Sequence, residues 1–136
     1  MFDYEGELAF IVGCGGRHIS REDAWSHVAG YTCFAENSVR DWQRHSQQVT
    51  AGKNFDRSGA CGPWMVTADA MPDVRSLALT TRLNGVAVQH DTTAILVFDI
   101  PTILDYVSAF TTLSPGDVIV RGRPMASVRR VSRRCG

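Results

Sequence analysis

A continuous apolar run from Leu8 to Val12 is the feature that most constrains how this chain can fold. Glycines lie on both sides of the run, and a short apolar segment bounded in this way is typical of a buried β-strand rather than of a helix. Glu5 and Glu7 lead directly into it. Because successive side chains of a strand point to opposite faces, these two carboxylates are expected to share one face. The segment therefore predicts a buried strand with two acids at its mouth.

These acids allow two interpretations. Hard divalent cations prefer carboxylate oxygen and water, so two acids held together are a candidate metal site. The simpler alternative is an ordinary solvated strand end, because a short motif without structural context is a weak hypothesis. A third acid, Glu36, follows the segment from Tyr31 to Ala35, whose β-branched and aromatic residues predict a second strand. Glu36 is thus expected where loops converge on ligands.

Lys53 stands out because it is the only lysine among 14 basic residues. Lysine is a compact cation whose pKa shifts when it is desolvated, so it can polarise or deprotonate a substrate where arginine cannot. An exposed loop lysine is the alternative. The polar segment from 37 to 63, predicted to hold a short helix over 38–48, favours the functional interpretation because loops of this length are usually functional or disordered. Gly52 is expected to supply backbone freedom beside the lysine.

Turn and helix signals predict the remaining elements. Asn84-Gly85 is a strong signal for a two-residue hairpin turn between strands over 77–83 and 86–89. Several strands with two or three short helices predict an α+β domain that is mainly β. Two further helices are predicted. One is capped by Ser20 and ends at Gly30, with its apolar stripe on Ala24, Trp25, Val28 and Ala29, and the other begins at Pro101, with its stripe on Ile103, Leu104, Val107 and Phe110. Strands are predicted over 64–67 and 118–120, and the segment 94–98 is either a strand or the lead into a helix.

Composition excludes several classes of protein. The 136 residues suffice for one domain with a real core. No apolar stretch approaches the length of a membrane span, and no secretory signal is visible, so we expect a cytoplasmic protein without a membrane partner. Cys14, Cys33, Cys61 and Cys135 have neither zinc-ligand nor redox spacing and are expected to be buried free thiols.

The formal net charge of zero hides an uneven distribution. Residues 1–120 hold all 14 acidic residues but only 8 of the 14 basic ones, and the other six are arginines within 121–136. A charge break this sharp marks a tail outside the packed domain. Clustered arginine neutralises phosphate, so a nucleic-acid-binding arm is one interpretation. A disordered terminus is the favoured one, because the segment offers few large apolar residues to bury.

Eight short sequence blocks follow one another between residues 3 and 120. They are Asp-Tyr-Glu-Gly-Glu-Leu-Ala (3–9), Ala-Gly-Tyr-Thr (29–32), Ser-Val-Arg-Asp-Trp-Gln (38–43), Gly-Lys-Asn-Phe-Asp (52–56), Gly-Pro-Trp-Met-Val-Thr-Ala-Asp (62–69), Leu-Asn-Gly (83–85), Phe-Asp-Ile-Pro (98–101) and Ser-Pro-Gly-Asp-Val-Ile (114–119). In this order they closely resemble the C-terminal catalytic domain of the fumarylacetoacetate hydrolase family.

This resemblance implies a mixed β-sandwich roll with short helices, of which residues 1–120 form a partial catalytic domain. By motif match it implies that Glu5, Glu7 and Glu36 bind Mg²⁺ or Mn²⁺ and that Lys53 is the active-site lysine. It further implies a homodimeric hydrolase, lyase or isomerase. Such an enzyme cleaves, decarboxylates or tautomerises small 2-oxo or 1,3-dicarbonyl acids, such as acylpyruvates and oxaloacetate, through a metal-stabilised enolate.

Two departures from the family pattern leave alternatives open. The family's further N-terminal segment has no counterpart before the first strand, and its Thr-Gly-Thr-Pro-Gly-Gly block is Arg121-Gly122-Arg123-Pro124-Met125-Ala126 here. We therefore expect a domain that is truncated at both ends relative to the family. One alternative function is a folded but inactive fragment that keeps the metal site, and a weaker one is nucleic-acid binding by the arginine-rich tail, residues 121–136.

Overall fold

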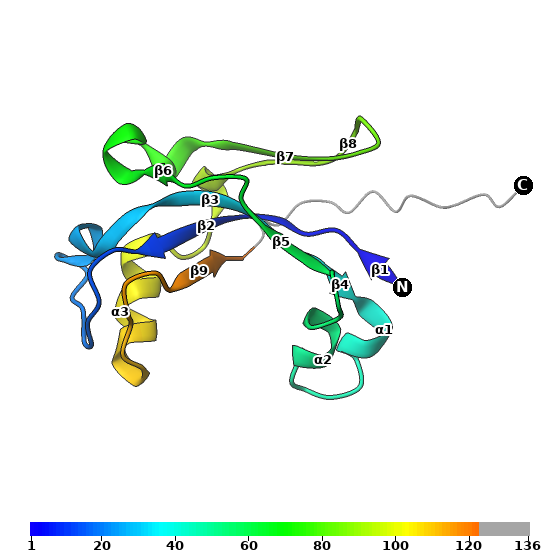
Figure 1. Cartoon of the computed structure of the whole chain (residues 1–136), viewed down its shortest axis with the longest axis horizontal. Helices are drawn as coiled ribbons and strands as arrows, with labels where there is room; N and C mark the ends of the chain where they lie inside the picture. Colours follow the sequence, from blue (N-terminus) through cyan, green and yellow to red (C-terminus); the bar gives the residue numbers. More distant parts are fainter. Residues whose placement is uncertain (123–136) are drawn as a thin grey trace, which may run out of the picture.

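The apolar run near the N-terminus forms an inner strand of the main sheet, as predicted. The computed structural model describes residues 1–122, and the run lies within β2 (Gly6–Val12). β2 pairs antiparallel with β3 (Val28–Glu36) on one side and with β9 (Val118–Arg121) on the other. Two short strands, β5 (Gly59–Cys61) and β6 (Val66–Thr67), pair with β3 on its far side. Figure 1 shows these strands as the middle layer of the molecule.

One face of this sheet carries the hydrophobic core. Leu8, Phe10 and Val12 alternate along β2 and are buried in one cluster with Ile100 and Leu104 of α3 (Ile100–Phe110), the helix below the sheet in Figure 1. Burying a side chain of this size stabilises the fold by about 1.5–3 kcal/mol relative to leaving it exposed. The cluster is completed by Ile19, Ala24, Val28, Tyr31, Val74 and Leu113.

α3 (Ile100–Phe110) follows the predicted start signal. Pro101 lies in its first turn, and the side chain of Asp99 caps it by accepting a backbone N–H from the first turn at 2.9 Å. Phe110, expected on the buried stripe, is 64% exposed. Ser108 is buried instead, because the loop that contains His18 and Ile19 packs against it. The Oγ of Ser108 accepts the backbone N–H of Ile19 at 2.9 Å, and its carbonyl accepts that of His18 at 3.0 Å.

The predicted hairpin is confirmed. β7 (Ala78–Leu83) and β8 (Val86–Thr92) pair antiparallel and form the uppermost layer in Figure 1. Asn84 and Gly85 form the turn with φ values of 50° and 82°. Both residues lie in the left-handed region that a two-residue hairpin of this kind requires, which explains the Asn-Gly pair.

The helix predicted to end at Gly30 is wrong over its second half. Only Ala24–His27 form a 3₁₀ turn, and β3 begins at Val28. Residues from Val28 onward pair with β2 and β6, and this tertiary pairing outweighs the helical spacing of the apolar residues. Gly30 is required for close approach rather than as a helix stop, since a Cβ there would lie 2.3 Å from the carbonyl oxygen of Val66.

The single helix predicted over 38–48 is also corrected. β4 (Ser38–Val39) pairs with β1 (Phe2–Asp3), which keeps its backbone extended. Two short helices follow, α1 (Arg40–Gln43) and α2 (Thr50–Lys53). In Figure 1 they form a separate lobe at the lower right, beside the N-terminus.

The middle of the chain contains less regular structure than predicted. The strand expected over 64–67 is confined to β6. Of the two alternatives for 94–98, the strand is wrong, and the segment instead leads into the helix that begins at Ile100. Three further 3₁₀ turns cover Ala68–Ala70, Val74–Ser76 and Thr93–Ile95.

Two predictions from composition have different outcomes. Cys14, Cys33 and Cys61 are free thiols, but they are exposed rather than buried. Cys33 is exposed because the buried residues of β3 end at Thr32, one position before it. Cys135 lies outside the described residues. No helix within residues 1–122 is long and apolar enough to cross a membrane.

Arg121 is the first residue of the predicted tail, residues 121–136, and it lies in a strand of the main sheet. Arg121 is the last residue of β9 and is 5% exposed. Its guanidinium donates to the carbonyl of Phe98 from Nε at 3.2 Å and from Nη2 at 2.9 Å. Arg121 therefore belongs to the folded domain, while residues 123–136 of the predicted tail lie outside the described part of the chain.

Candidate metal centre

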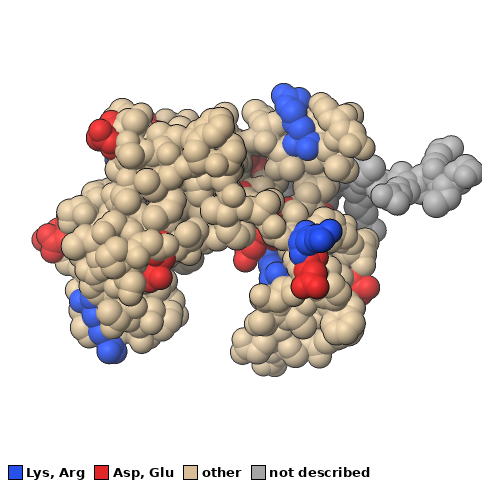
Figure 2. All heavy atoms as spheres, in the orientation of Figure 1, with Lys and Arg blue, Asp and Glu red and all other residues tan. Residues whose placement is uncertain are grey.

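The three carboxylates singled out from the sequence converge at one point. Glu5, Glu7 and Glu36 each offer a ligand oxygen, and these oxygens lie within 4.8 Å of one another. Glu5 and Glu7 are buried, with 8% and 3% of their surface exposed, and Glu36 is partly exposed. Figure 2 shows acidic and basic atoms side by side at the inner end of the hollow between the lobe formed by α1 and α2 and the part of the molecule that contains α3. The alternative of an ordinary solvated strand end does not fit acids buried in this way.

Strand pairing brings these acids together. The register of β2 and β3 pairs Gly6 with Ala35, so the beginning of one strand lies opposite the end of the other. The N–H of Glu36 donates to the carbonyl of Glu5 at 2.9 Å, and the N–H of Glu5 donates to Oδ1 of Asn37 at 3.1 Å. The antiparallel pairing therefore places acids that are far apart in sequence at one end of the sheet.

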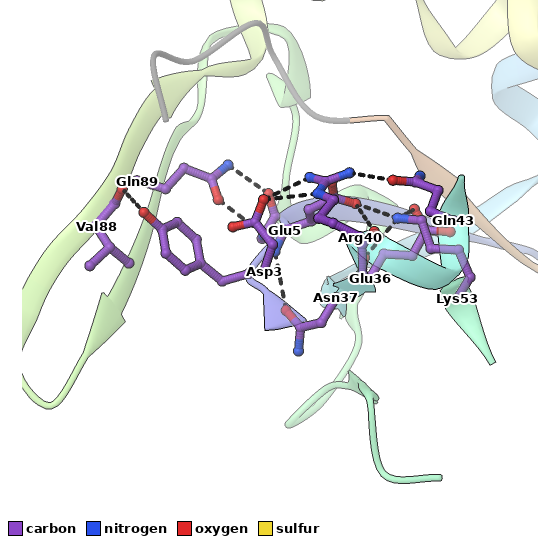
Figure 3. Close-up of polar contacts among 12 residues, drawn as sticks. Asp3, Glu5, Glu36, Asn37, Arg40, Gln43, Lys53, Val88 and Gln89 are labelled. Atoms are coloured by element: carbon purple, nitrogen blue, oxygen red, sulfur yellow. Dashed lines mark hydrogen bonds and ion pairs between the residues drawn. The ribbon is translucent and has the colours of Figure 1, made fainter. Parts of the chain in front are cut away.

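Lys53 reaches the same cluster from α2. Its Nζ forms an ion pair with Glu5, donates to the carbonyl of Glu36 at 2.8 Å and approaches Oε2 of that residue at 3.2 Å (Figure 3). The lysine side chain is only 16% exposed, so Lys53 is not an exposed loop lysine. Gly52 is helical and permits close packing, since a Cβ there would lie 2.7 Å from Cβ of Gln43.

Sequence reasoning missed Arg40 and Gln43, which extend the cluster from α1 with one charged and one polar side chain. Arg40 forms an ion pair with Glu5, donates from Nε to Oδ2 of Asp3 at 2.9 Å and donates from Nη1 to Oε1 of Gln43 at 2.8 Å. Figure 3 shows these side chains arranged around Glu5. Their i, i+3 spacing in the block at 38–43 was the available signal, because residues so spaced lie on one helix face.

The two cations control the charge state of Glu5. Burial would raise the pKa of its carboxyl, but the hydrogen bonds and positive charges of Lys53 and Arg40 outweigh burial, so the pKa lies below its usual value. Burial alone would lower the pKa of Arg40, and the neighbouring carboxylates of Asp3 and Glu5 raise it. Glu5 is therefore ionised at neutral pH.

The donor set fits a divalent cation. Asp3, Glu5, Glu7 and Glu36 carry four formal negative charges against the two positive charges of the cations that contact them, which leaves a formal balance of −2. A cation of charge +2 would neutralise this remainder. The closely spaced ligand atoms are all carboxylate oxygens, as Mg²⁺ and Mn²⁺ prefer.

Comparison with known proteins decides the family. The sequence profile described as fumarylacetoacetate (FAA) hydrolase C-terminal matches residues 1–135. This chain belongs to that family. Its mainly β, α+β fold is shared with other FAA hydrolase family members, including fumarylacetoacetate hydrolase from psychrophilic Exiguobacterium antarcticum. That structure is 41% identical, with a TM-score of 0.86, and the match covers 91% of this chain and 44% of that one.

Other relatives within the FAA hydrolase family have enzyme names. The chain is 42% identical over 124 residues to the mitochondrial oxaloacetate tautomerase of Xenopus laevis, a match that covers 90% of this chain and 39% of that protein. Maleylpyruvate hydrolase from Sphingobium sp. SYK-6, solved with manganese(II) and pyruvate, is 37% identical with a TM-score of 0.81, over 90% of this chain and 44% of that one. The chain thus spans less than half the length of these relatives.

Proposed function

We propose that this chain carries the metal site of an enzyme that acts on small 2-oxo or 1,3-dicarbonyl acids by C–C cleavage, decarboxylation or tautomerisation. The observation that supports this most strongly is the convergence of the Glu5, Glu7 and Glu36 oxygens within 4.8 Å, with the Lys53 ammonium against two of the three residues. In this proposal the three glutamates hold Mg²⁺ or Mn²⁺, and Lys53 acts on the substrate.

The chemistry follows from the charges in the site. A divalent cation held there would stabilise the negative charge of an enolate formed from a 2-oxo acid. Lys53 adds a second positive charge on the same side and carries a proton at Nζ that it can exchange with the substrate. Arg40 holds Glu5 and Gln43 in fixed positions, so the carboxylate need not reorient during the reaction.

The relatives support the substrate class. One is named an oxaloacetate tautomerase and another a maleylpyruvate hydrolase, and the solved structure of the latter contains manganese(II) and pyruvate. Oxaloacetate and pyruvate are both 2-oxo acids, whose neighbouring carboxylate and oxo oxygens can chelate one cation. The present site, built from carboxylates and a lysine, suits the same type of substrate.

The first test is a thermal melt of the chain with and without millimolar Mn²⁺, with Glu7→Gln as the control. A ligand that binds only the folded state raises the melting temperature. We expect Mn²⁺ to raise the melting temperature of the parent and not that of the variant. An equal response of both proteins would contradict the assignment of Glu7 as a ligand.

The second test is turnover of acylpyruvates and oxaloacetate with Mg²⁺ or Mn²⁺. Turnover that Glu7→Gln abolishes would establish the enzyme and exclude an inactive fragment. Metal binding without turnover across this panel would favour the alternative of a folded but inactive fragment that keeps the metal site.

The remaining expectations about partners and location stay predictions. Homodimer formation and a cytoplasmic location are not tested by the described residues. For the nucleic-acid alternative, Arg121 is already bonded to Phe98 within the fold, which leaves that role to arginines beyond residue 122. Salt-sensitive binding that disappears when 123–136 are deleted would be required to establish it.

A further inference from the structure

The β7–β8 hairpin contacts the metal centre from the side opposite β3, through one buried amide. Gln89 of β8 is 5% exposed. Its Oε1 accepts the backbone N–H of Gly6 at 3.0 Å, and its Nε2 donates to the backbone carbonyl of the same residue at 2.8 Å. Gly6 is the residue between Glu5 and Glu7, and Figure 3 shows Gln89 reaching the backbone beside Glu5. One side chain thus binds both backbone polar groups between two of the expected metal ligands.

The direction of the strand explains why an amide is needed there. Along β2, the N–H and carbonyl of Val12 point toward the β9 side, where they pair with Asp117 and Gly116. Backbone groups of alternate residues point the same way, so those of Gly6 do as well. Within the described residues, pairing of β2 with β9 reaches only Leu8. Gln89 therefore occupies the place that a strand residue would otherwise take beside Gly6.

A second hairpin residue holds the amide in this orientation. Thr81 lies opposite Gln89 in the hairpin, and its Oγ1 donates to Oε1 of Gln89 at 3.0 Å. Two donors on Oε1 leave Nε2 directed at the carbonyl of Gly6. The contact is also tight, since a Cβ at Gly6 would lie 2.0 Å from Oγ1 of Thr81. The hairpin thus rests directly on the backbone that carries the two acids.

We propose that Gln89 is a positioning residue of the metal centre. By holding the backbone of Gly6 it fixes the directions in which Glu5 and Glu7 present their carboxylates to one divalent cation. This inference rests on the proposed function, because it requires that cation. Groups that orient metal ligands without touching the metal typically change metal affinity about 10–100-fold when they are replaced. Gln89 orients two ligands at once.

The test is Mn²⁺ binding to the full chain, measured by calorimetric titration and by electron paramagnetic resonance of the bound ion. Gln89→Met removes both hydrogen bonds to Gly6 and keeps an unbranched side chain of similar length. His90→Met is the matched control, because His90 is the next residue of β8 and its ring bonds Thr80 at 2.9 Å in an exposed position. We expect Gln89→Met to weaken Mn²⁺ binding about 10-fold or more and to change the resonance spectrum. His90→Met should stay within about twofold of the parent, as a surface substitution.

Each outcome decides the proposal. Equal Mn²⁺ affinity of Gln89→Met and His90→Met would overturn it, even if Gln89→Met melts at a lower temperature without metal, because the role of Gln89 would then be structural only. A parent chain that binds no Mn²⁺ would instead refute the proposed function, and this inference with it.

A second pair of variants serves if Gln89→Met does not fold. Thr81→Val removes the hydroxyl that orients the amide, and Thr80→Val makes the same change one position earlier in β7, where the hydroxyl bonds His90. Weaker Mn²⁺ binding in Thr81→Val than in Thr80→Val supports the proposal, and equal binding overturns it.

Discussion

Residues at or beside both ends of β2 are buried, but by different surroundings. At one end Phe10 and Val12 are 0% and 1% exposed within an apolar cluster. At the other end Glu5 and Glu7 are 8% and 3% exposed, among charged groups from β3, α1 and α2. Apolar burial is favourable in itself, whereas burial of a carboxylate must be offset by ion pairs and hydrogen bonds. A buried strand can therefore carry an apolar core at one end and a charged cluster at the other.

The largest expected effect lies at the apolar end. Leu104→Ala removes a side chain that is 0% exposed and packs in the cluster with Phe10, so it should lower the free energy of unfolding by about 2–5 kcal/mol. Urea denaturation measures this loss. Tyr106→Ala on the same helix is the control, because that side chain is 72% exposed and should change stability by less than about 0.5 kcal/mol. Similar losses in both variants would mean that α3 is not held by its buried stripe.

The next effect separates two acids within the charged end. Glu5→Gln removes the charge that pairs with Lys53 and Arg40, and leaving these cations without it should cost about 1–3 kcal/mol of stability. Glu36→Gln should cost less than about 1 kcal/mol, because its side chain is 38% exposed. Both variants should lose the increase in melting temperature that Mn²⁺ gives the parent. Equal stability of the two variants would show that burial does not distinguish the two acids.

A smaller effect, of opposite sign, is expected for the lysine. Lys53→Met removes a positive charge beside the proposed cation, so Mn²⁺ binding should tighten by on the order of 1–2 kcal/mol while turnover of a 2-oxo acid falls. Lys53→Arg keeps the charge and should bind Mn²⁺ like the parent. Titration calorimetry compares the three proteins. Weaker binding to Lys53→Met would instead mean that Lys53 is needed to hold Glu5 in place.

These two ends of β2 also differ in how far they could be predicted. Local patterns were enough for the apolar strand, the Asn-Gly hairpin and the start of α3, because each depends on neighbours in the chain. They failed at Val28–Gly30, where pairing with β2 and β6 decided the conformation. Apolar side chains with regular spacing therefore predict an element, but not when a distant strand competes for the same backbone.

The charged end depends on contacts that leave no local signal. Glu36 was noticed as an acid at a strand end and Lys53 as the only lysine, and the family resemblance assigned their roles, but nothing in their neighbourhoods required that they meet Glu5. Arg40 and Gln89 were missed, because their roles rest on hydrogen bonds across 35 and 83 positions. The helical spacing of Arg40 and Gln43 predicts that the two side chains share one helix face, but it does not predict that this face contacts Glu5.

The smallest expected effect is the loss at low pH of the stabilisation that the Asp99 cap gives to α3. Asp99, at the start of α3, and Glu5 both have a pKa below the ordinary value for their residue type, which is 3.8 for Asp99. For Asp99 the main cause is the hydrogen bond from Thr102 rather than a neighbouring cation. Because the folded pKa is the lower one, the stabilisation by this cap is present above the unfolded value of 3.8 and is lost as the pH falls through the folded pKa. Asp99→Ala should therefore cost about 1 kcal/mol at neutral pH. Melts across an acid series should show the parent and the variant converging below the unfolded value, whereas a constant difference would mean that the Asp99 carboxylate does not act as the cap.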